Sequence, residues 1–495
     1  MKSLSDKFLD AIFWVVIDKL GGSVSNFLIT IILARLLMPE DFGLLAMVMV
    51  VVSITAGIVD SGFSLALIRA KEISELDKST TFLFNLVAAS ILYAILYFTA
   101  PLIADFFEQE GLAWILRVMG LTLIIDSFTL IQRALLTQQI DFKTQTAVRI
   151  PAIVVSGGVG ISMAYYGWGV WSLVGQQLVR GGLTTAILWK IFPLPIWNQF
   201  SWASFHRFFS FGFKILISGL VGKFYDEIYK LVIGKFFAAA ILGYFTQANN
   251  FLMIVVNPLS STILRVTYPV LAKLQDEPTA LKEGYRKLIM MTSFGLLPVL
   301  TLMGIMAAPA VSFIFGDKWL PSVPFLQMLC AAAVTNHLQY INANAILVKG
   351  RSDYTLTLEI VDKIFITIAI FVGIQMGIYG LVGSVVVSSY FNLFIYVYFA
   401  NKVIDYSLRE QFGDFSASLG YSLLMGGAVY LLMRVLNLPD LAVLGIGGIT
   451  GLALYFGLHF VTKTKESDYL LSMLLPKLRR FLKKEKVEPE WPAQQ

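Results

Sequence analysis

Apolar runs long enough to cross a membrane recur along nearly the whole sequence, and they constrain the fold more than any other feature. A membrane-spanning helix takes about 20 predominantly apolar residues. The apolar share of the 495 residues is 57%, enough for about fourteen such helices. The runs, bounded by charges, prolines and glycines, lie at about 8–37, 42–68, 82–104, 113–135, 144–166, 169–191, 207–236, 241–270, 287–315, 321–348, 354–375, 378–401, 415–436 and 440–461.

The composition excludes several classes of protein. Only 14% of the residues are charged, roughly half the share in a soluble domain, and the mean hydropathy is +0.74. A soluble core cannot hide that much apolar surface, so a soluble enzyme and a disordered chain are both excluded. Cys330 is the lone cysteine, so no intrachain disulfide can form. Since backbone polar groups in lipid need partners within their own segment, and the alternating strands of a barrel are missing, we expect α-helices.

Basic residues gather on one side of the predicted membrane and indicate its orientation. With the N-terminus in the cytoplasm, 25 lysines and arginines fall in the inside segments and the tail. Cytoplasmic loops carry such an excess, so we expect a multi-pass protein with both termini in the cytoplasm. The net charge of +6 therefore reflects topology rather than a nucleic-acid partner. The opposite face has only Lys235, Lys318 and Arg434 in or beside its loops, with Arg35 and Arg117 at helix ends.

The two ends of the chain carry patterns of their own. Asp18 and Lys19 interrupt the first apolar run, and no small-residue cleavage site follows. This run is therefore predicted to remain as the first helix rather than to be removed as a signal peptide. After Val461, leucines share one helical face and basic residues crowd the others. Such a tail is typical of an amphipathic helix on an anionic leaflet, or of a solvated basic segment.

The sequence repeats itself at an offset of about 200 residues. Arg35 then falls on Lys235 and Gly43 on Gly243, and further along 165–175 matches 375–385 at an offset of 210. Two copies with an even number of helices share one topology and are related by an axis along the membrane normal. We therefore expect two pseudo-symmetric six-helix lobes around a central cavity, followed by two further helices. The predicted boundaries are 1–195 and 196–405 for the lobes, 406–462 for the appended helices and 463–495 for the basic tail.

Polar residues recur at helical spacing inside runs that the repeat relates to one another. Charged side chains within a bilayer are costly and usually face protein or water. These stripes are therefore predicted to line a hydrated cavity between the lobes. The predicted substrate-binding residues are Lys19, Ser23 and Asn26 in the first run, Asp60 in the second, Lys223, Asp226 and Lys230 in the seventh, and Arg265 in the eighth.

A structural interpretation of the same charges stays open. Lys223 with Glu227, and Asp226 with Lys230, are four residues apart and can neutralise each other along one helix. Lys19 and Asp60 lie at similar depths and can also form a pair. Further candidates for the cavity are Asp126 and Arg180, whereas the cluster of Glu359, Asp362 and Lys363 is typical of a helix-packing network.

The charges of the predicted cavity are unequal in number. Five basic residues, with Lys214 included, oppose three acids, Glu227 among them. A positive excess focuses a field that favours an anionic headgroup, whereas an antiporter of cationic drugs would need acids.

Motifs for bond chemistry are missing from the sequence. No G-x-x-x-x-G-K-[ST] loop for phosphate binding occurs. The histidines at 206, 337 and 459 lie too far apart for the spacing of a metal site. No nucleophile motif stands out, and the outside loops are shorter than we expect of a membrane polymerase. We therefore predict no enzymatic activity, no cofactor and no metal.

Five stretches carry a resemblance to a known family. They are LARLLMPEDFGLLAMV (33–48), DSGFSLALIRAKEIS (60–74), TTFLFN (80–85), RVTYPVLAKLQDE (265–277) and FGDKWLPSVPFLQMLC (315–330). In these stretches the sequence resembles the polysaccharide (O-antigen-type) flippases of the multidrug/oligosaccharidyl-lipid/polysaccharide exporter superfamily. It is most similar to members of the colanic-acid-exporter type.

The resemblance implies two six-helix lobes that move an undecaprenyl-diphosphate-linked oligosaccharide across the bacterial inner membrane by alternating access. Basic cavity residues, here Lys19, Lys223 and Arg265, would hold the diphosphate or acidic sugars. The implied partners are the lipid-linked oligosaccharide, membrane lipids, a coupling ion and polysaccharide assembly proteins, for exopolysaccharide, capsule or O-antigen synthesis. Two other functions stay open: a cation-coupled multidrug antiporter of the same fold, and a membrane polysaccharide polymerase.

Overall fold

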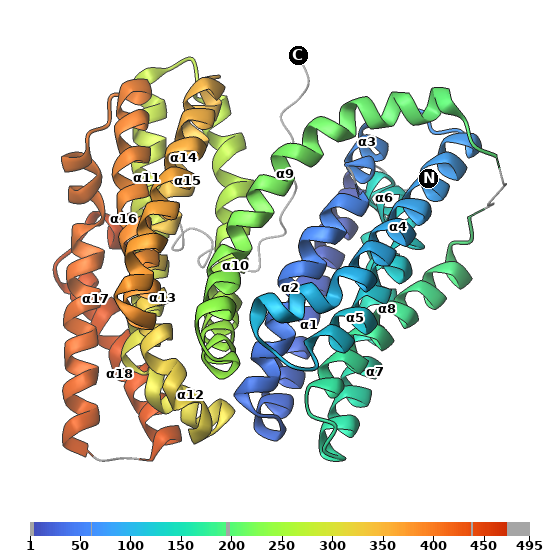
Figure 1. Cartoon of the computed structure of the whole chain (residues 1–495). Helices are drawn as coiled ribbons and strands as arrows, with labels where there is room; N and C mark the ends of the chain where they lie inside the picture. The colour runs from blue at the N-terminus through green and yellow to red at the C-terminus, as the bar shows by residue number, and fades with distance from the viewer. Residues whose placement is uncertain (1–3, 61, 195–198, 437–438, 473–495) are drawn as a thin grey trace. The chain divides into compact units, whose positions relative to one another are not determined.

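Every regular element is a helix in the part of the chain that the computed structural model describes, residues 4–60, 62–194, 199–436 and 439–472 (Figure 1). Side chains are described there except at 4–13, 16, 19, 20, 214 and 259–266. The helices are α1 (Leu4–Leu36), α2 (Pro39–Asp60), α3 (Phe63–Arg69), α4 (Glu75–Phe107), α5 (Leu112–Ser127), α6 (Leu130–Gln138), α7 (Phe142–Tyr165), α8 (Val170–Ile191), α9 (Trp202–Phe236), α10 (Ala239–Lys273), α11 (Pro278–Ile305), α12 (Ala307–Phe315), the 3₁₀ helix η1 (Asp317–Ser322), α13 (Val323–Ala333), α14 (Asn336–Val348), α15 (Ser352–Gln375), α16 (Gly377–Ile404), α17 (Leu408–Leu436) and α18 (Asp440–Val461).

Each predicted apolar run coincides with one helix or with consecutive helices. Within the described residues, eight helices are long and apolar enough to cross a membrane, or up to ten if two bent pairs each count as one span. The all-α, multi-pass membrane fold is thus confirmed, while the predicted number of fourteen spans is not. Some helices fail this test because polar residues interrupt them: α8 contains Gln176, Gln177 and Arg180, and α15 contains Glu359 and Asp362.

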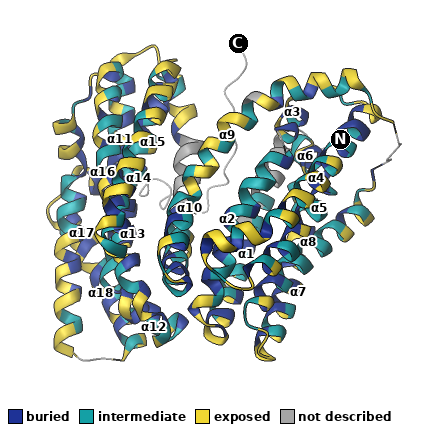
Figure 2. Ribbon diagram, viewed as in Figure 1, coloured by how far each residue is buried: buried dark blue, intermediate teal, exposed yellow. Residues whose placement is uncertain are grey.

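The helices expose many large apolar side chains, and Figure 2 shows where the exposed residues lie along them. On α4, for example, Phe98 is 78% exposed and Leu102 is 69% exposed. A soluble protein rarely leaves a continuous apolar surface of this kind open to water. These faces are therefore suited to contact with lipid tails.

The predicted run at 113–135 forms two consecutive helices, α5 and α6, with a sharp bend between them. α5 ends at Ser127 and α6 begins at Leu130, with an angle of 42° between the two helices. The hydroxyl of Ser127 donates to the carbonyl of Ile124 at 2.7 Å, and that of Thr129 donates to the carbonyl of Asp126 at 3.0 Å. Such bonds satisfy backbone groups that a break in a membrane helix sets free.

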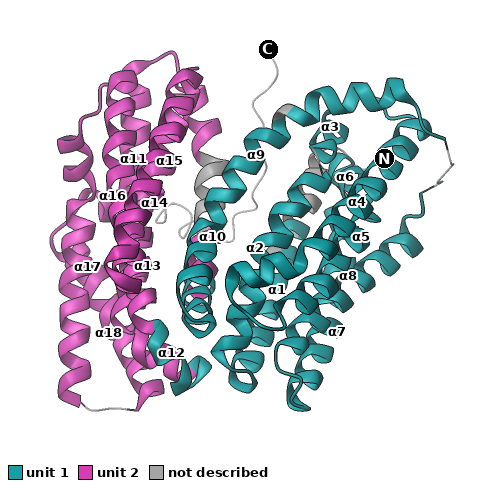
Figure 3. Cartoon of the chain, viewed as in Figure 1, with its two compact units in different colours: residues 1–250, 314–322 teal, residues 251–313, 323–495 magenta. Residues whose placement is uncertain are grey.

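The chain divides into two compact units (Figure 3). Unit 1 contains residues 1–250 and 314–322, and unit 2 contains residues 251–313 and 323–495. The lobe boundaries predicted from the repeat divide the chain at other positions and stay a prediction.

Two glycines bring α2 and α10 into backbone contact within unit 1. A Cβ atom on Gly43 would lie 1.8 Å from the carbonyl oxygen of Ala239, and one on Gly243 would lie 1.9 Å from that of Pro39. No residue with a side chain fits these distances. The four residues form two pairs separated by the 200-residue offset of the repeat. The contact is therefore reciprocal, as in an interface between two equivalent copies.

The segment 314–322 caps the C-terminal end of α1 in unit 1. Lys318 Nζ donates to the carbonyl of Arg35 at 2.9 Å, and Trp319 Nε1 donates to that of Ala34 at 2.8 Å. The last carbonyls of a helix lack partners within it and attract a cation. Trp319 is fully buried, and burial lowers the pKa of the Lys318 ammonium. These contacts give a structural role to Lys318 and Trp319 in FGDKWLPSVPFLQMLC, one of the stretches that carry the family resemblance.

Ion pairs attach α17 to α11 within unit 2. Arg286 donates two hydrogen bonds to Asp414, at 2.8 and 2.7 Å, and the buried hydroxyl of Tyr406 donates to the same carboxylate. Lys282 Nζ lies 2.9 Å from Glu410 Oε1. Bidentate arginine–carboxylate pairs are geometrically specific. The first of the two helices predicted as appended is therefore held firmly in unit 2.

We predict that Gly43→Ala destabilises the protein, because the added methyl group would overlap the Ala239 carbonyl. Overpacking of this kind costs about 1–3 kcal/mol, and more where the obstacle is backbone. The measurement is the thermal unfolding temperature in detergent. Gly158→Ala on α7 is the control, because nothing lies within 4 Å of that position. Equal melting temperatures for Gly43→Ala and the wild type would contradict the close contact.

Candidate pocket in unit 1

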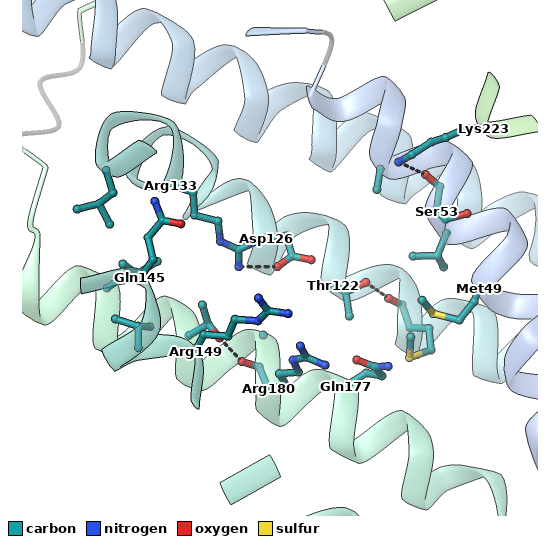
Figure 4. Close-up of a pocket in the computed structure, with 18 residues that line it drawn as sticks. Met49, Ser53, Thr122, Asp126, Arg133, Gln145, Arg149, Gln177, Arg180 and Lys223 are labelled. Atoms are coloured by element: carbon teal, nitrogen blue, oxygen red, sulfur yellow. Dashed lines mark hydrogen bonds and ion pairs between the residues drawn. The ribbon is translucent and has the colours of Figure 1, made fainter. Parts of the chain in front are cut away.

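A pocket of about 560 Å³ lies inside unit 1, among α2, α5, α6, α7, α8 and α9 (Figure 4). The bend between α5 and α6 lies beside this space, since Asp126 before it and Arg133 after it both line the pocket. The wall includes apolar side chains such as Met49, Met119 and Leu188. The polar side chains that line it are Ser53, Thr122, Asp126, Arg133, Gln145, Arg149, Gln177, Arg180, Thr184 and Lys223.

Four basic side chains and one carboxylate line the pocket. Arg133, Arg149 and Arg180 extend into the same space in Figure 4, with Lys223 at its other end. Asp126 is the acid among the lining residues. A cavity with this excess of positive charge and low-dielectric walls concentrates a field that attracts anions.

Each arginine is positioned by an oxygen of a neighbouring side chain. Arg149 Nη1 donates to Asp18 Oδ2 at 2.6 Å, across from α7 to α1. Arg133 Nη2 lies 3.5 Å from Asp126 Oδ1, and Arg180 Nη1 lies 3.5 Å from the amide oxygen of Asn26.

These contacts leave donors available for a ligand. A guanidinium group has five N–H donors, and each of the contacts above engages only part of them. The Arg133 and Arg149 side chains are 45% and 46% exposed, so neither is sealed off by its acidic partner. Both are therefore positioned without being fully neutralised.

Lys223 reaches the pocket by crossing α2. Its ammonium donates to the carbonyl of Ser53 at 3.1 Å. A Cβ atom on Gly57 would lie 3.3 Å from Lys223 Cδ, so the glycine leaves the room that the lysine needs. The side chain remains exposed at this position.

The arrangement is suited to binding rather than to bond chemistry. Arginine binds phosphate and carboxylate through two parallel hydrogen bonds, whereas lysine acts as a mobile point charge. Among the described residues, no group of three or more His, Cys, Asp or Glu side chains is placed to hold a metal ion. An oxyanion is therefore the ligand that the pocket fits best.

The structure brings two of the predicted site residues to this pocket. Lys223 lines it, and Asn26 contacts it through Arg180. Of the two weaker candidates from the sequence, Asp126 and Arg180 both line it.

The other predicted site residues lie elsewhere or are not described. Asp60 accepts a hydrogen bond of 2.5 Å from Ser64 Oγ at the junction of α2 and α3. Lys230 pairs with Glu227 at 2.7 Å, rather than with Asp226 as the alternative interpretation of these charges expected. Ser23 and Asp226 are exposed and do not line the pocket. The side chains of Lys19 and Arg265 are among those that the structure does not describe.

Sequence reasoning missed Arg133 and Arg149 as site residues. Arg133 stands near the end of the predicted run 113–135, and hydropathy does not show the bend between α5 and α6 that precedes it. Arg149 lies within an apolar run, two residues before Pro151. Its position inside a predicted span was a usable signal, since charges in spans are rarely placed against lipid.

The acidic cluster on α15 joins two helices of unit 2. Asp362 accepts hydrogen bonds from Asn392 on α16 and from Lys363, the latter at 2.9 Å. This agrees with the predicted role in helix packing.

Comparison with known families decides the classification of the chain. The model of a family described as polysaccharide biosynthesis protein matches residues 32–324, which is more than half of the chain. The chain belongs to this family. The matched region includes α2 to α11 and the segment 314–322, and it therefore includes the whole pocket.

Curated relatives in this family come from distant bacteria. The chain is 26% identical over 323 residues to the teichuronic acid biosynthesis protein TuaB of Bacillus subtilis, covering 65% of this chain and 67% of that protein. It is 23% identical over 379 residues to the lipopolysaccharide biosynthesis protein WzxC of Escherichia coli, covering 76% of both.

Solved structures share the fold of this family member. The lipid II flippase MurJ, in an inward closed conformation, superimposes with a TM-score of 0.73 and 13% identity, over 94% of this chain and 100% of that chain. An inward-facing multidrug resistance MATE family transporter of the MOP superfamily follows with a TM-score of 0.60 and 15% identity, over 80% and 98%. The family match confirms the predicted relation to polysaccharide biosynthesis proteins, and these structures confirm the fold that the resemblance implied.

We predict that the pocket is hydrated, because its charges would otherwise lie unsolvated in a low dielectric. A cysteine replacing Gln177, in a Cys330→Ala background, should react with a charged, water-soluble thiol reagent. A cysteine replacing the fully buried Ser156 on α7 is the control and should stay unreactive. The measurement is the labelled fraction by mass spectrometry. An unlabelled residue 177 would mean that the pocket is dry and closed.

Proposed function

We propose that the chain is a flippase that moves an undecaprenyl-diphosphate-linked oligosaccharide across the bacterial inner membrane, for exopolysaccharide, capsule or O-antigen synthesis. The observation that carries the proposal is the net-basic pocket of unit 1. It lies within a fold shared with a protein named as a lipid II flippase, and in a family described by polysaccharide biosynthesis.

The physical task of such a protein is to shield charge and sugar hydroxyls from about 30 Å of hydrocarbon. A diphosphate offers several oxygens to planar guanidinium groups, which bind it in pairs of parallel hydrogen bonds. Arg133, Arg149 and Arg180 supply such groups on three different helices. We assign them the diphosphate, and we assign Gln145 and Gln177, on the same wall, the nearest sugar hydroxyls.

The ion pairs of the pocket suit a site that must release its ligand. Asp126 and Asp18 hold Arg133 and Arg149 when no anion is present, so neither arginine is left uncompensated in the interior. An arriving diphosphate exchanges with these carboxylates, and its departure restores them.

A drug antiporter of the same fold is less well supported. Cationic drugs need acids in the cavity, whereas this pocket has four basic side chains and one carboxylate. A polymerase would need groups that make and break glycosidic bonds, and the lining offers no pair of carboxylates for that chemistry.

The cycle makes and breaks no covalent bond under this proposal. The driving force is an ion gradient, the membrane potential or consumption of the product outside, and each net charge moved is worth about 2.3 kcal/mol per 100 mV. Both termini lie in the cytoplasm, as the distribution of basic residues indicates. Polysaccharide assembly proteins are the expected partners on the outer side.

Deletion of the gene distinguishes the three functions. A flippase predicts loss of the surface polysaccharide, with single lipid-linked units retained on the cytoplasmic side. Accumulation of such units on the outer side would indicate a polymerase instead. A normal polysaccharide together with increased sensitivity to cationic drugs would indicate an antiporter.

We predict that Arg180→Gln reduces polysaccharide export at least tenfold, because the glutamine removes both the charge and the paired donors. Arg180→Lys should restore part of the export, since it keeps the charge. The measurement is surface polymer per cell at equal amounts of membrane-inserted protein. Arg117→Gln is the matched control: its guanidinium stacks on Tyr97 and Trp114, away from the pocket. Wild-type export by Arg180→Gln would refute the assignment of this site.

A further inference from the structure

Unit 2 contains a second cavity whose chemistry is opposite to that of the pocket. It holds about 440 Å³ and runs as a groove between α14, α16 and α17. Its lining is apolar, with Leu338, Leu393, Val397 and Phe415 buried in its floor. Phe394 and Phe412 at its edges are 55% and 54% exposed.

Three polar side chains in or beside this groove have partners within the protein, while Tyr390 adds a hydroxyl to the lining. Gln411 and Asn342 exchange two hydrogen bonds, at 3.1 and 3.2 Å, and the hydroxyl of Thr335 donates to the carbonyl of Ala332 at 3.0 Å. Gln411, Asn342 and Thr335 therefore need no hydrogen bond from a ligand. Apart from the Tyr390 hydroxyl and Arg409, what remains along the groove is hydrocarbon, which suits the tail of a lipid.

Arg409 is the one cation among the groove residues, and it lies at the end of the groove where α17 begins. It forms no ion pair with any residue that the structure describes. The two acids nearest to Arg409 on α17 already form ion pairs with other residues: Glu410 with Lys282, and Asp414 with Arg286. The groove thus ends at an exposed guanidinium whose neighbouring carboxylates are occupied.

The length of the groove fits one leaflet of a bilayer. From Leu408 to Leu419, the span of α17 that lines it, a helix rises about 16 Å. Half of the hydrocarbon core of a bilayer is about 15 Å. A second basic residue, Lys402, lies in the last turn of α16, a few residues before α17 begins. Its ammonium is 4.4 Å from the centre of the Tyr398 ring. Basic groups beside a gap between membrane helices are suited to an anionic lipid headgroup.

We propose that this groove binds one anionic phospholipid of the leaflet that faces Arg409, with an acyl chain in the groove and the phosphate on the guanidinium. With the N-terminus in the cytoplasm, that leaflet is the inner one. A polyprenyl carrier fits less well, because its chain is far longer than one leaflet. The inference is independent of the proposed flippase function, because it concerns a different unit, a different ligand and a readout without transport.

The test uses the full-length protein in nanodiscs with equal parts of phosphatidylethanolamine, phosphatidylglycerol and undecaprenyl phosphate. Native mass spectrometry after mild release counts the lipids that remain bound. We expect one phosphatidylglycerol on most wild-type molecules and at least fivefold less on Arg409→Gln. Arg409→Lys should be intermediate. The matched control is Arg434→Gln, at the other end of the same helix, where the guanidinium stacks on Tyr430; it should behave as the wild type.

Several outcomes would overturn the proposal. One is equal retention of phosphatidylglycerol by the wild type and Arg409→Gln. Another is equal retention of phosphatidylethanolamine and phosphatidylglycerol, because it would remove the role of charge. Preferential retention of undecaprenyl phosphate would assign the groove to the transported lipid. Leu419→Trp, which fills the groove and leaves Arg409 in place, should also lose the bound lipid; retention by this variant would show that the acyl chain lies elsewhere.

Discussion

The free energy of holding charge inside a bilayer governs how unit 1 is built. Each basic residue near the centre of a membrane costs ~2.5–3.5 kcal/mol on insertion scales, and this unit places three arginines around its pocket. They are tolerated because they share one interior space and because Asp18, Asp126 and Asn26 supply oxygens to them. Two residues of the site, Gln177 and Arg180, also lower the hydropathy of α8, which is one reason why this helix does not count among the apolar spans.

Hydropathy predicted the helices well because one local property, about 20 apolar residues in a row, decides whether a segment can cross lipid. It could not predict the bend at residues 128 and 129, since that break depends on hydroxyls which close on nearby carbonyls. It also could not predict that the segment 314–322 joins unit 1. That attachment depends on contacts between Lys318, Trp319 and the end of α1, which lie some 280 residues away in the chain.

Helical periodicity located part of the site and left part of it out. Asn26 and Lys223 each belong to a row of polar residues at helical spacing along their own helix. Such a pattern can be seen directly in a sequence. Arg133 is the one charge on α6, and Arg149 is the one charge in the interior of α7 after Lys143 in its first turn. Their meeting depends on the packing of six helices around one pocket. Isolated charges carry no periodicity, so only the tertiary structure could show that they converge.

The pocket of unit 1 and the groove of unit 2 differ in the side chains that line them, although the sequence repeat relates some of their positions. At the offset of 210 residues found in the sequence, Arg180 on α8 corresponds to Tyr390 on α16, and Thr184 corresponds to Phe394. The first residue of each pair lines the basic pocket, and the second lines the apolar groove. At the positions that the repeat relates, one helix thus lines a net-basic pocket in unit 1 and the other lines a mainly apolar groove in unit 2. By contrast, the reciprocal contact of Gly43 and Gly243 has kept its symmetry, because a side chain at either position would meet backbone of the other copy.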